Sequence, residues 1–138
     1  MTPLRAEGDY SDDGITTTVR GWAGPVRAGL HPATGGDGSD ACSGDMLLQA
    51  VLACAGVTLR SVATALGDNV RRAELNAVAS FDARGTLGVS REAPVGIQGL
   101  VITARLDTDA SEAKLAERYC VVGQSLAEIR RSVVTRGE

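Results

Sequence analysis

Residues 43–60 read SGDMLLQAVLACAGVTLR, and this stretch decides the fold. The pattern predicts a long helix over residues 45–66, with Ser43 as its N-cap and Gly67 directly after its last turn. Asp45 lies where a negative charge favours the positive end of the helix dipole. Nearly every face of this helix is apolar, which is typical of a helix buried on most sides. Because a chain of 138 residues can rarely surround such a helix alone, the pattern favours a dimer.

The segment before the helix is rich in Gly, Asp and Thr. Two short runs, residues 15–19 and 26–30, have the composition of strands, and residues 11–14 predict a hairpin turn because Asp-Gly tolerates a positive φ. Residues 31–40 predict a loop. The glycine-rich stretch inside it, residues 35–38, indicates a tight turn, because the Lys-Ser/Thr pair of a nucleotide-binding loop does not follow it.

After the helix the hydrophobic period changes from helical to alternating. Residues 75–81 and 100–106 predict two strands that pair with each other across the connecting segment 85–96. Asp109 and Glu112 form a variant of the capping box, which predicts a helix through Glu117 toward Cys120.

Residues 125–134 are interpreted as a last helix, after which we expect no further apolar strand before Glu138. Together the expected elements define an α+β fold in a single domain over residues 1–138.

Composition excludes several function classes. A formal net charge of -3, with basic and acidic residues spread along the chain, offers no basic stripe for nucleic acid. Residues 1–7 lack the apolar stretch of a secretory signal, and each apolar run is interpreted as too short and interrupted to span a bilayer. The sequence therefore indicates a cytoplasmic protein without a membrane partner. No Cys-x-x-Cys or Cys/His cluster has metal-ligand spacing, so we expect no metal or cofactor.

Two of the three cysteines have informative surroundings. Cys54 lies in the middle of the apolar helix and Cys120 lies far along the chain, and two such thiols could reduce a peroxide and close a disulfide. Plain burial is the alternative for each, because cysteine is often buried. Cys42, in the loop before the helix, is interpreted as a spectator thiol, with a role as alternative resolving partner left open. His31, the only histidine, is interpreted as a surface residue.

Several stretches together are similar to one known family. They are the glycine-rich loop at residues 35–38, the helix sequence at 43–60, Tyr119-Cys120-Val121-Val122, and Ser125-Leu126. This set resembles the OsmC/Ohr family of thiol peroxidases. The resemblance implies an OsmC-like α+β fold in which antiparallel sheets pack on a long central helix. It also implies an intertwined homodimer with active sites at the interface.

The resemblance also implies a chemistry. Cys54 would be the peroxidatic thiol, Cys120 would resolve its sulfenic acid to a disulfide, and a dithiol reductant would restore both thiols. In the organic hydroperoxide branch, an Arg on the first hairpin and a Glu after a Pro activate the thiolate. Here Gly44 occupies the Glu position and Asp45 comes one residue late. Arg5, Arg20 and Arg27 are the candidate substitutes for the arginine, and Arg20 is the most plausible of them.

Two function classes therefore remain open. The preferred one is a thiol-dependent peroxidase that reduces an organic peroxide or hydrogen peroxide through Cys54 and Cys120. The other is a non-enzymatic OsmC-like protein that binds a small apolar or thiol ligand at the dimer interface. Retention of both cysteines favours the first class, whereas loss of the Glu–Arg pair favours the second.

Overall fold

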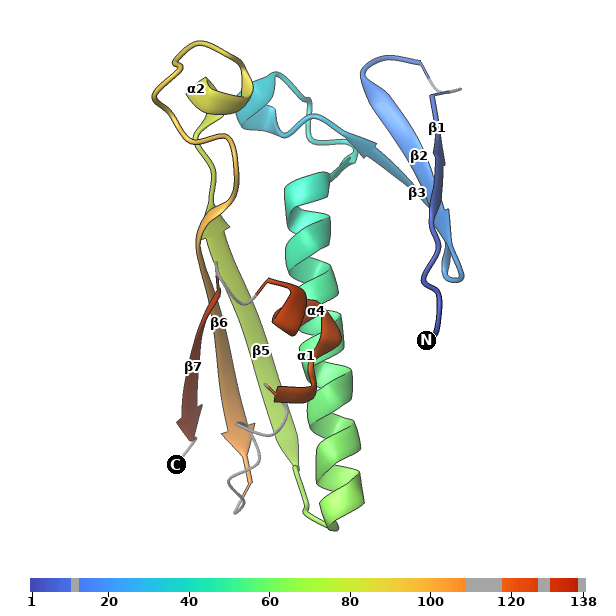
Figure 1. Cartoon of the computed structure of the whole chain (residues 1–138), viewed down its shortest axis with the longest axis vertical. Helices are drawn as coiled ribbons and strands as arrows, with labels where there is room; N and C mark the ends of the chain where they lie inside the picture. Colours follow the sequence, from blue (N-terminus) through green and yellow to red (C-terminus); the bar gives the residue numbers. More distant parts are fainter. Residues whose placement is uncertain (11–12, 109–117, 127–129, 137–138) are drawn as a thin grey trace.

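The architecture is organised along one long helix. The computed structural model describes residues 1–10, 13–108, 118–126 and 130–136. Helix α1 (Ser43–Leu66) runs along most of the molecule, with a three-stranded sheet beside it and a four-stranded sheet at its N-terminal end (Figure 1). The expected α+β class and the central helix are confirmed.

Helix α1 begins at Ser43, two residues earlier than the predicted start at Asp45. Its N-cap is Cys42, and Ser43 is already helical, so the assignment of Ser43 as the cap is wrong. The helix ends as predicted, at Gly67 in the left-handed conformation with φ 73°, which glycine adopts without steric cost.

The three-stranded sheet consists of β5 (Arg72–Ser80), β6 (Gln98–Asp107) and β7 (Arg130–Arg136). The predicted pairing of the first two is confirmed: they are antiparallel, with the short helix α2 (Ala83–Thr86) in their connection. Leu59 of α1 and Leu106 of β6 are buried together in the core. Gly56 lets β5 approach the helix, because a Cβ added there would lie 3.1 Å from Leu75 Cδ1.

The end of the chain corrects the sequence interpretation. Residues 130–136 form β7, parallel to β6, so the predicted helix over 125–134 is wrong, as is the expectation that no strand follows. Val133, Val134 and Thr135 are β-branched, which favours a strand over a helix. The helix predicted from Asp109 to Glu117 lies outside the described residues.

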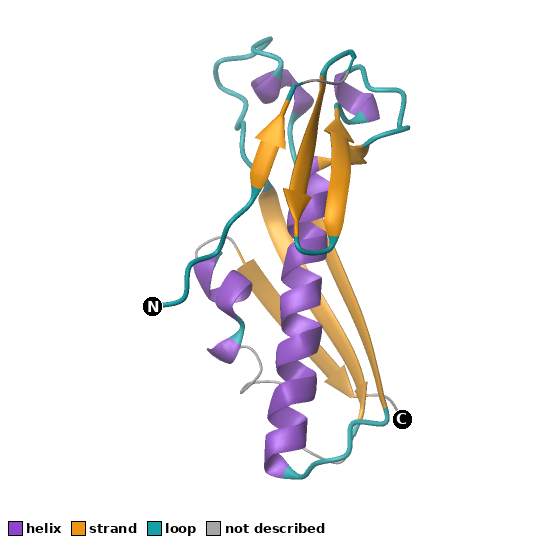
Figure 2. Ribbon diagram, turned by 90° about the vertical axis from the view of Figure 1, so that its right-hand side faces the viewer, coloured by secondary structure: helices purple, strands orange, loops and turns teal. Residues whose placement is uncertain are grey.

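The four-stranded sheet has the order β1 (Glu7–Asp9), β2 (Thr16–Gly21), β3 (Gly24–Gly29) and β4 (Ala41–Cys42). The two strands predicted near residues 15–19 and 26–30 are thus confirmed as β2 and β3. Both sheets are mixed, because β3–β4 and β6–β7 are parallel pairs, whereas antiparallel sheets were expected. Strand β4 runs directly into α1, while β1–β3 stand away from the side of the helix (Figures 1 and 2).

The apolar surface of α1 is only partly covered within one chain. Val51, Leu59 and Ala63 are buried, whereas Val57 is 72% exposed. By length and composition α1 could cross a membrane, contrary to the sequence expectation that every apolar run is too short. This is weak support for a membrane span, because the core helix of a soluble protein has the same properties.

Candidate functional site

The fold brings Cys54 and Cys120 together. Cys54 is half-buried in the middle of α1, and Cys120, only 2% exposed, is the N-cap of the short helix α4 (Val121–Ser125). Helix α4 packs against α1 (Figure 1), and the Cys120 side chain lies close enough to the Cys54 thiol to help lower the pKa of Cys54. Two thiols that are distant in sequence are therefore in contact in the folded chain.

Cys120 also stabilises the helix on which it lies. Its Sγ accepts a hydrogen bond from the Gly123 N–H at 3.3 Å, and its carbonyl accepts one from the Gln124 N–H at 2.8 Å. The sulfur contact satisfies one of the N–H groups that have no backbone partner in the first turn of a helix, and the carbonyl contact is the first backbone hydrogen bond of α4. The cap fixes the Cys120 sulfur in a position that faces α1.

The surroundings of Cys54 favour its thiolate. Burial raises the pKa of Cys54, but hydrogen bonds from the Val122 backbone, the Cys120 side chain, the Thr58 side chain and the Val121 backbone outweigh it, so the pKa is lowered. The Thr58 hydroxyl oxygen lies 4.0 Å from the Cys54 sulfur. Because the thiolate is the nucleophile, a lowered pKa makes Cys54 more reactive near neutral pH.

Part of this environment could not be predicted from the sequence. An arginine was expected beside Cys54, whereas the groups above are neutral donors. Thr58 could have been found, because residues four apart lie on the same face of a helix. The backbone of Val121 and Val122 could not, since nothing in a sequence shows that α4 turns its first residues toward α1.

Arg20 lies on β2, in the N-terminal sheet. Its guanidinium forms an ion pair with Asp9 on the neighbouring strand, and it is not among the groups that most affect the Cys54 pKa in the described part of the chain. Gly44 and Asp45 are in the first turn of α1, far along the helix from Cys54. A role for Arg20 in activating the thiol stays a prediction.

The third thiol, that of Cys42, lies in a different part of the molecule from Cys54 and Cys120. Cys42 lines a pocket of about 400 Å³ near the start of α1, together with His31, Gly44 and Phe81. It precedes Cys54 by roughly twelve residues, or about 18 Å along the helix axis. Cys42 is therefore poorly placed to resolve an oxidised Cys54 of the same chain.

His31 has a structural role at this pocket. Its Nδ1 accepts a hydrogen bond from the Ala33 N–H at 3.0 Å and caps the 3-10 turn η1 (Pro32–Thr34), while its ring packs edge-on against Phe81. No group of three or more His, Cys, Asp or Glu side chains that could hold a metal occurs in the ranges that the structure describes.

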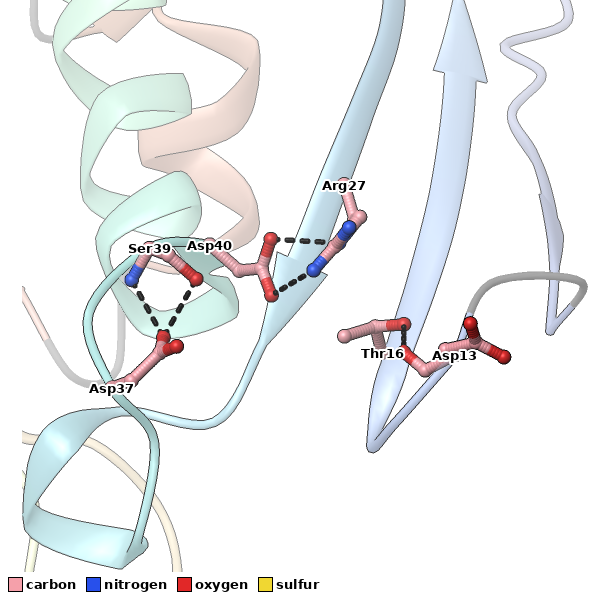
Figure 3. A network of polar contacts seen from close by, with 6 residues as sticks. All are labelled: Asp13, Thr16, Arg27, Asp37, Ser39 and Asp40. Atoms are coloured by element: carbon pink, nitrogen blue, oxygen red, sulfur yellow. Dashed lines mark hydrogen bonds and ion pairs between the residues drawn. The ribbon is translucent and has the colours of Figure 1, made fainter.

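The loop before α1 forms a turn that hydrogen bonds and an ion pair hold in place, as the sequence indicated. Asp37 Oδ1 accepts hydrogen bonds from the Ser39 N–H at 2.8 Å and the Ser39 hydroxyl at 2.6 Å, and these bonds lower the Asp37 pKa (Figure 3). Arg27 of β3 pairs with Asp40 at 2.8 Å. Gly36 has no room for a side chain, since a Cβ there would lie 1.8 Å from the Leu30 carbonyl oxygen. The loop thus sets the direction in which α1 begins.

Comparisons with known proteins agree with this architecture. The family model described as OsmC-like protein matches residues 36–133. An OsmC-like protein from Mycoplasma pneumoniae has a similar crystal structure, with TM-score 0.77, 12% identity, and coverage of 99% of this chain and 96% of that chain. None of the curated proteins matches this sequence.

Two further structural neighbours have names that include a function. An organic hydroperoxide resistance protein from Elizabethkingia anophelis has TM-score 0.72 and 15% identity, with coverage of 100% of this chain and 99% of that chain. The organic hydroperoxide resistance protein OhrB of Bacillus subtilis has TM-score 0.64 and 11% identity, with coverage of 99% and 98%. At these identities the likeness shows the fold alone.

Proposed function

Since this chain belongs to the OsmC-like protein family, we propose that it is a thiol-dependent peroxidase that reduces organic hydroperoxides or hydrogen peroxide. The observation that supports this most is the contact between Cys54 and the buried Cys120, in surroundings that lower the Cys54 pKa. The names of two structural neighbours, both organic hydroperoxide resistance proteins, support the substrate class.

The reaction uses the two sulfurs in turn. The Cys54 thiolate attacks the outer oxygen of the peroxide, the O–O bond breaks, and the leaving alkoxide takes a proton to become an alcohol. Cys54 is then a sulfenic acid. The Cys120 sulfur attacks it, a water molecule leaves, and a disulfide joins the two residues.

A dithiol reductant completes the cycle. It exchanges with the disulfide, becomes oxidised itself and restores both thiols, so this scheme needs no metal or cofactor. We place the protein in the cytoplasm, where such reductants keep thiols reduced. Neither nucleic acid nor a membrane has a part in the scheme.

The functional unit that we propose is a homodimer. Within one chain, several large apolar side chains are strongly exposed. Val57 lies on α1, and Tyr10, Ile15 and Trp22 lie on or beside the N-terminal sheet. A second chain could cover both surfaces, because β1–β3 project away from their own helix (Figures 1 and 2). Large exposed apolar surfaces of this kind are typical of obligate interfaces.

Sedimentation at micromolar concentration tests the homodimer. We expect about twice the mass of one chain, and a shift toward monomer in Val57→Asp, because burying an unpaired carboxylate is costly. Leu87→Asp is the matched control, since Leu87 is also exposed but lies in the β5–β6 connection. A stable, folded monomer of the unmodified protein would contradict the homodimer.

The activity itself is tested with cumene hydroperoxide and dithiothreitol. We expect the protein to consume peroxide faster than the dithiol alone. Without the dithiol, one equivalent of peroxide should join the peptides that contain Cys54 and Cys120, as peptide mass spectrometry would show. If consumption equals that of the dithiol alone, the peroxidase proposal fails.

The pocket near the start of α1 favours a second candidate function. It has a volume of about 400 Å³, and Leu47, Phe81, Val95 and Ile97 give it an apolar lining. This size is in the range of small-molecule pockets. A non-enzymatic protein that binds a small apolar or thiol ligand would retain ligand binding in Cys54→Ser, which distinguishes it from the peroxidase.

A further inference from the structure

We propose that Thr58 is a positioning residue, which holds the Cys54 sulfur in place and stabilises its thiolate form. The proposal rests on the proposed peroxidase function, because it assigns a role at the same sulfur. The family resemblance instead implies that an arginine activates the Cys54 thiolate. Here the donor belongs to the same helix as the nucleophile.

The geometry within α1 supports this role. Cys54 and Thr58 are four residues apart, so their side chains lie on one face of the helix. Both are half-buried, and the Cys54 Sγ and Thr58 Oγ1 atoms are 4.0 Å apart. A hydroxyl in this position can donate its proton to a thiolate, which accepts hydrogen bonds more strongly than a thiol.

A second threonine in the same helix shows what is unusual about Thr58. Thr64 donates its hydroxyl to the Arg60 carbonyl oxygen at 2.8 Å, the common arrangement for a threonine inside a helix. The Thr58 hydroxyl instead contacts the side chain one turn earlier, the Cys54 sulfur. Thr64 is exposed and lies almost three helical turns after Cys54, so it provides a matched control.

The position of Thr58 complements the other donors. The Val121 and Val122 backbone groups approach the sulfur from α4, and Thr58 approaches it from α1. Donors on two elements restrict the rotation of the Cys54 side chain more than donors on one. Cys120 is the titratable group that faces Cys54 from α4.

The test is the pH dependence of Cys54 alkylation by iodoacetamide, followed by peptide mass spectrometry so that the three thiols are resolved. In Thr58→Val, which keeps the shape and removes the donor, we expect the midpoint to rise. Below the midpoint the alkylation rate should fall by about three- to tenfold, the contribution of one ordinary hydrogen bond, because a contact of 4.0 Å is long for a bond to a charged group. Thr58→Ser should restore the rate of the unmodified protein, and Thr64→Val should leave it unchanged.

Two additions keep the outcome unambiguous. The series is repeated in Cys120→Ser, where Cys54 titrates without a neighbouring thiol, and Thr58→Ala serves if the valine variant does not fold. An unchanged alkylation profile in the folded Thr58 variants would overturn the proposal. Because alkylation needs no peroxide, a Thr58 effect in a protein that consumes no peroxide would support the positioning role while the peroxidase proposal fails.

Discussion

Replacing Cys54 by serine is expected to abolish peroxide consumption, leaving the rate of the dithiol alone. A serine hydroxyl is not ionised near neutral pH and cannot form a sulfenic acid, so both the attack and the disulfide step are lost. The substitution changes one atom at a half-buried position, so the helix should keep its structure. The measurement is cumene hydroperoxide consumption with dithiothreitol as reductant.

Cys42→Ser is the control for this result. It also removes one thiol, but at the N-cap of α1, roughly 18 Å from Cys54 along the helix. We expect nearly unchanged consumption, and serine is a favourable residue at an N-cap. Equal activity of Cys54→Ser and the unmodified protein would exclude Cys54 as the nucleophile and favour the ligand-binding alternative.

The sequence predicted the parts of the fold that depend on local pattern. The apolar run of residues 45–66 and Gly67 placed α1 to within two residues, and the alternation around Leu75 and Leu100 placed β5 and β6. It did not predict β7, because the period of residues 130–136 is ambiguous and the strand is specified by its parallel pairing with β6. Pairing between distant segments overrides weak local preference.

The candidate site also has features that the sequence predicts and features that depend on packing. Cys54 and Cys120 were found from their surroundings and from a family resemblance, but their contact depends on the packing of α4 against α1. The arginine expected beside Cys54 was implied by the family resemblance. Among the described residues, neutral donors on two elements lower the Cys54 pKa, and of these only Thr58 can be recognised from helical spacing.

Replacing Cys120 by serine is expected to stop the reaction after one oxidation event per chain. Cys54 should still attack the peroxide, but no sulfur is left nearby to displace water from its sulfenic acid. Serine is suited to this test because Cys120 is an N-cap whose Sγ accepts the Gly123 N–H, and a serine hydroxyl can accept that bond and preserve α4. The loss of turnover is then separated from a loss of structure.

Trapping with dimedone distinguishes the steps in this variant. After one equivalent of peroxide, a dimedone adduct should accumulate on Cys54 in Cys120→Ser and remain scarce in the unmodified protein, where the disulfide forms first. The Cys120→Ala variant should form the same adduct while losing about 1 kcal/mol of stability with its cap. If Cys120→Ser turns over at the unmodified rate, another thiol resolves Cys54, and the contact between Cys54 and Cys120 has a structural role instead.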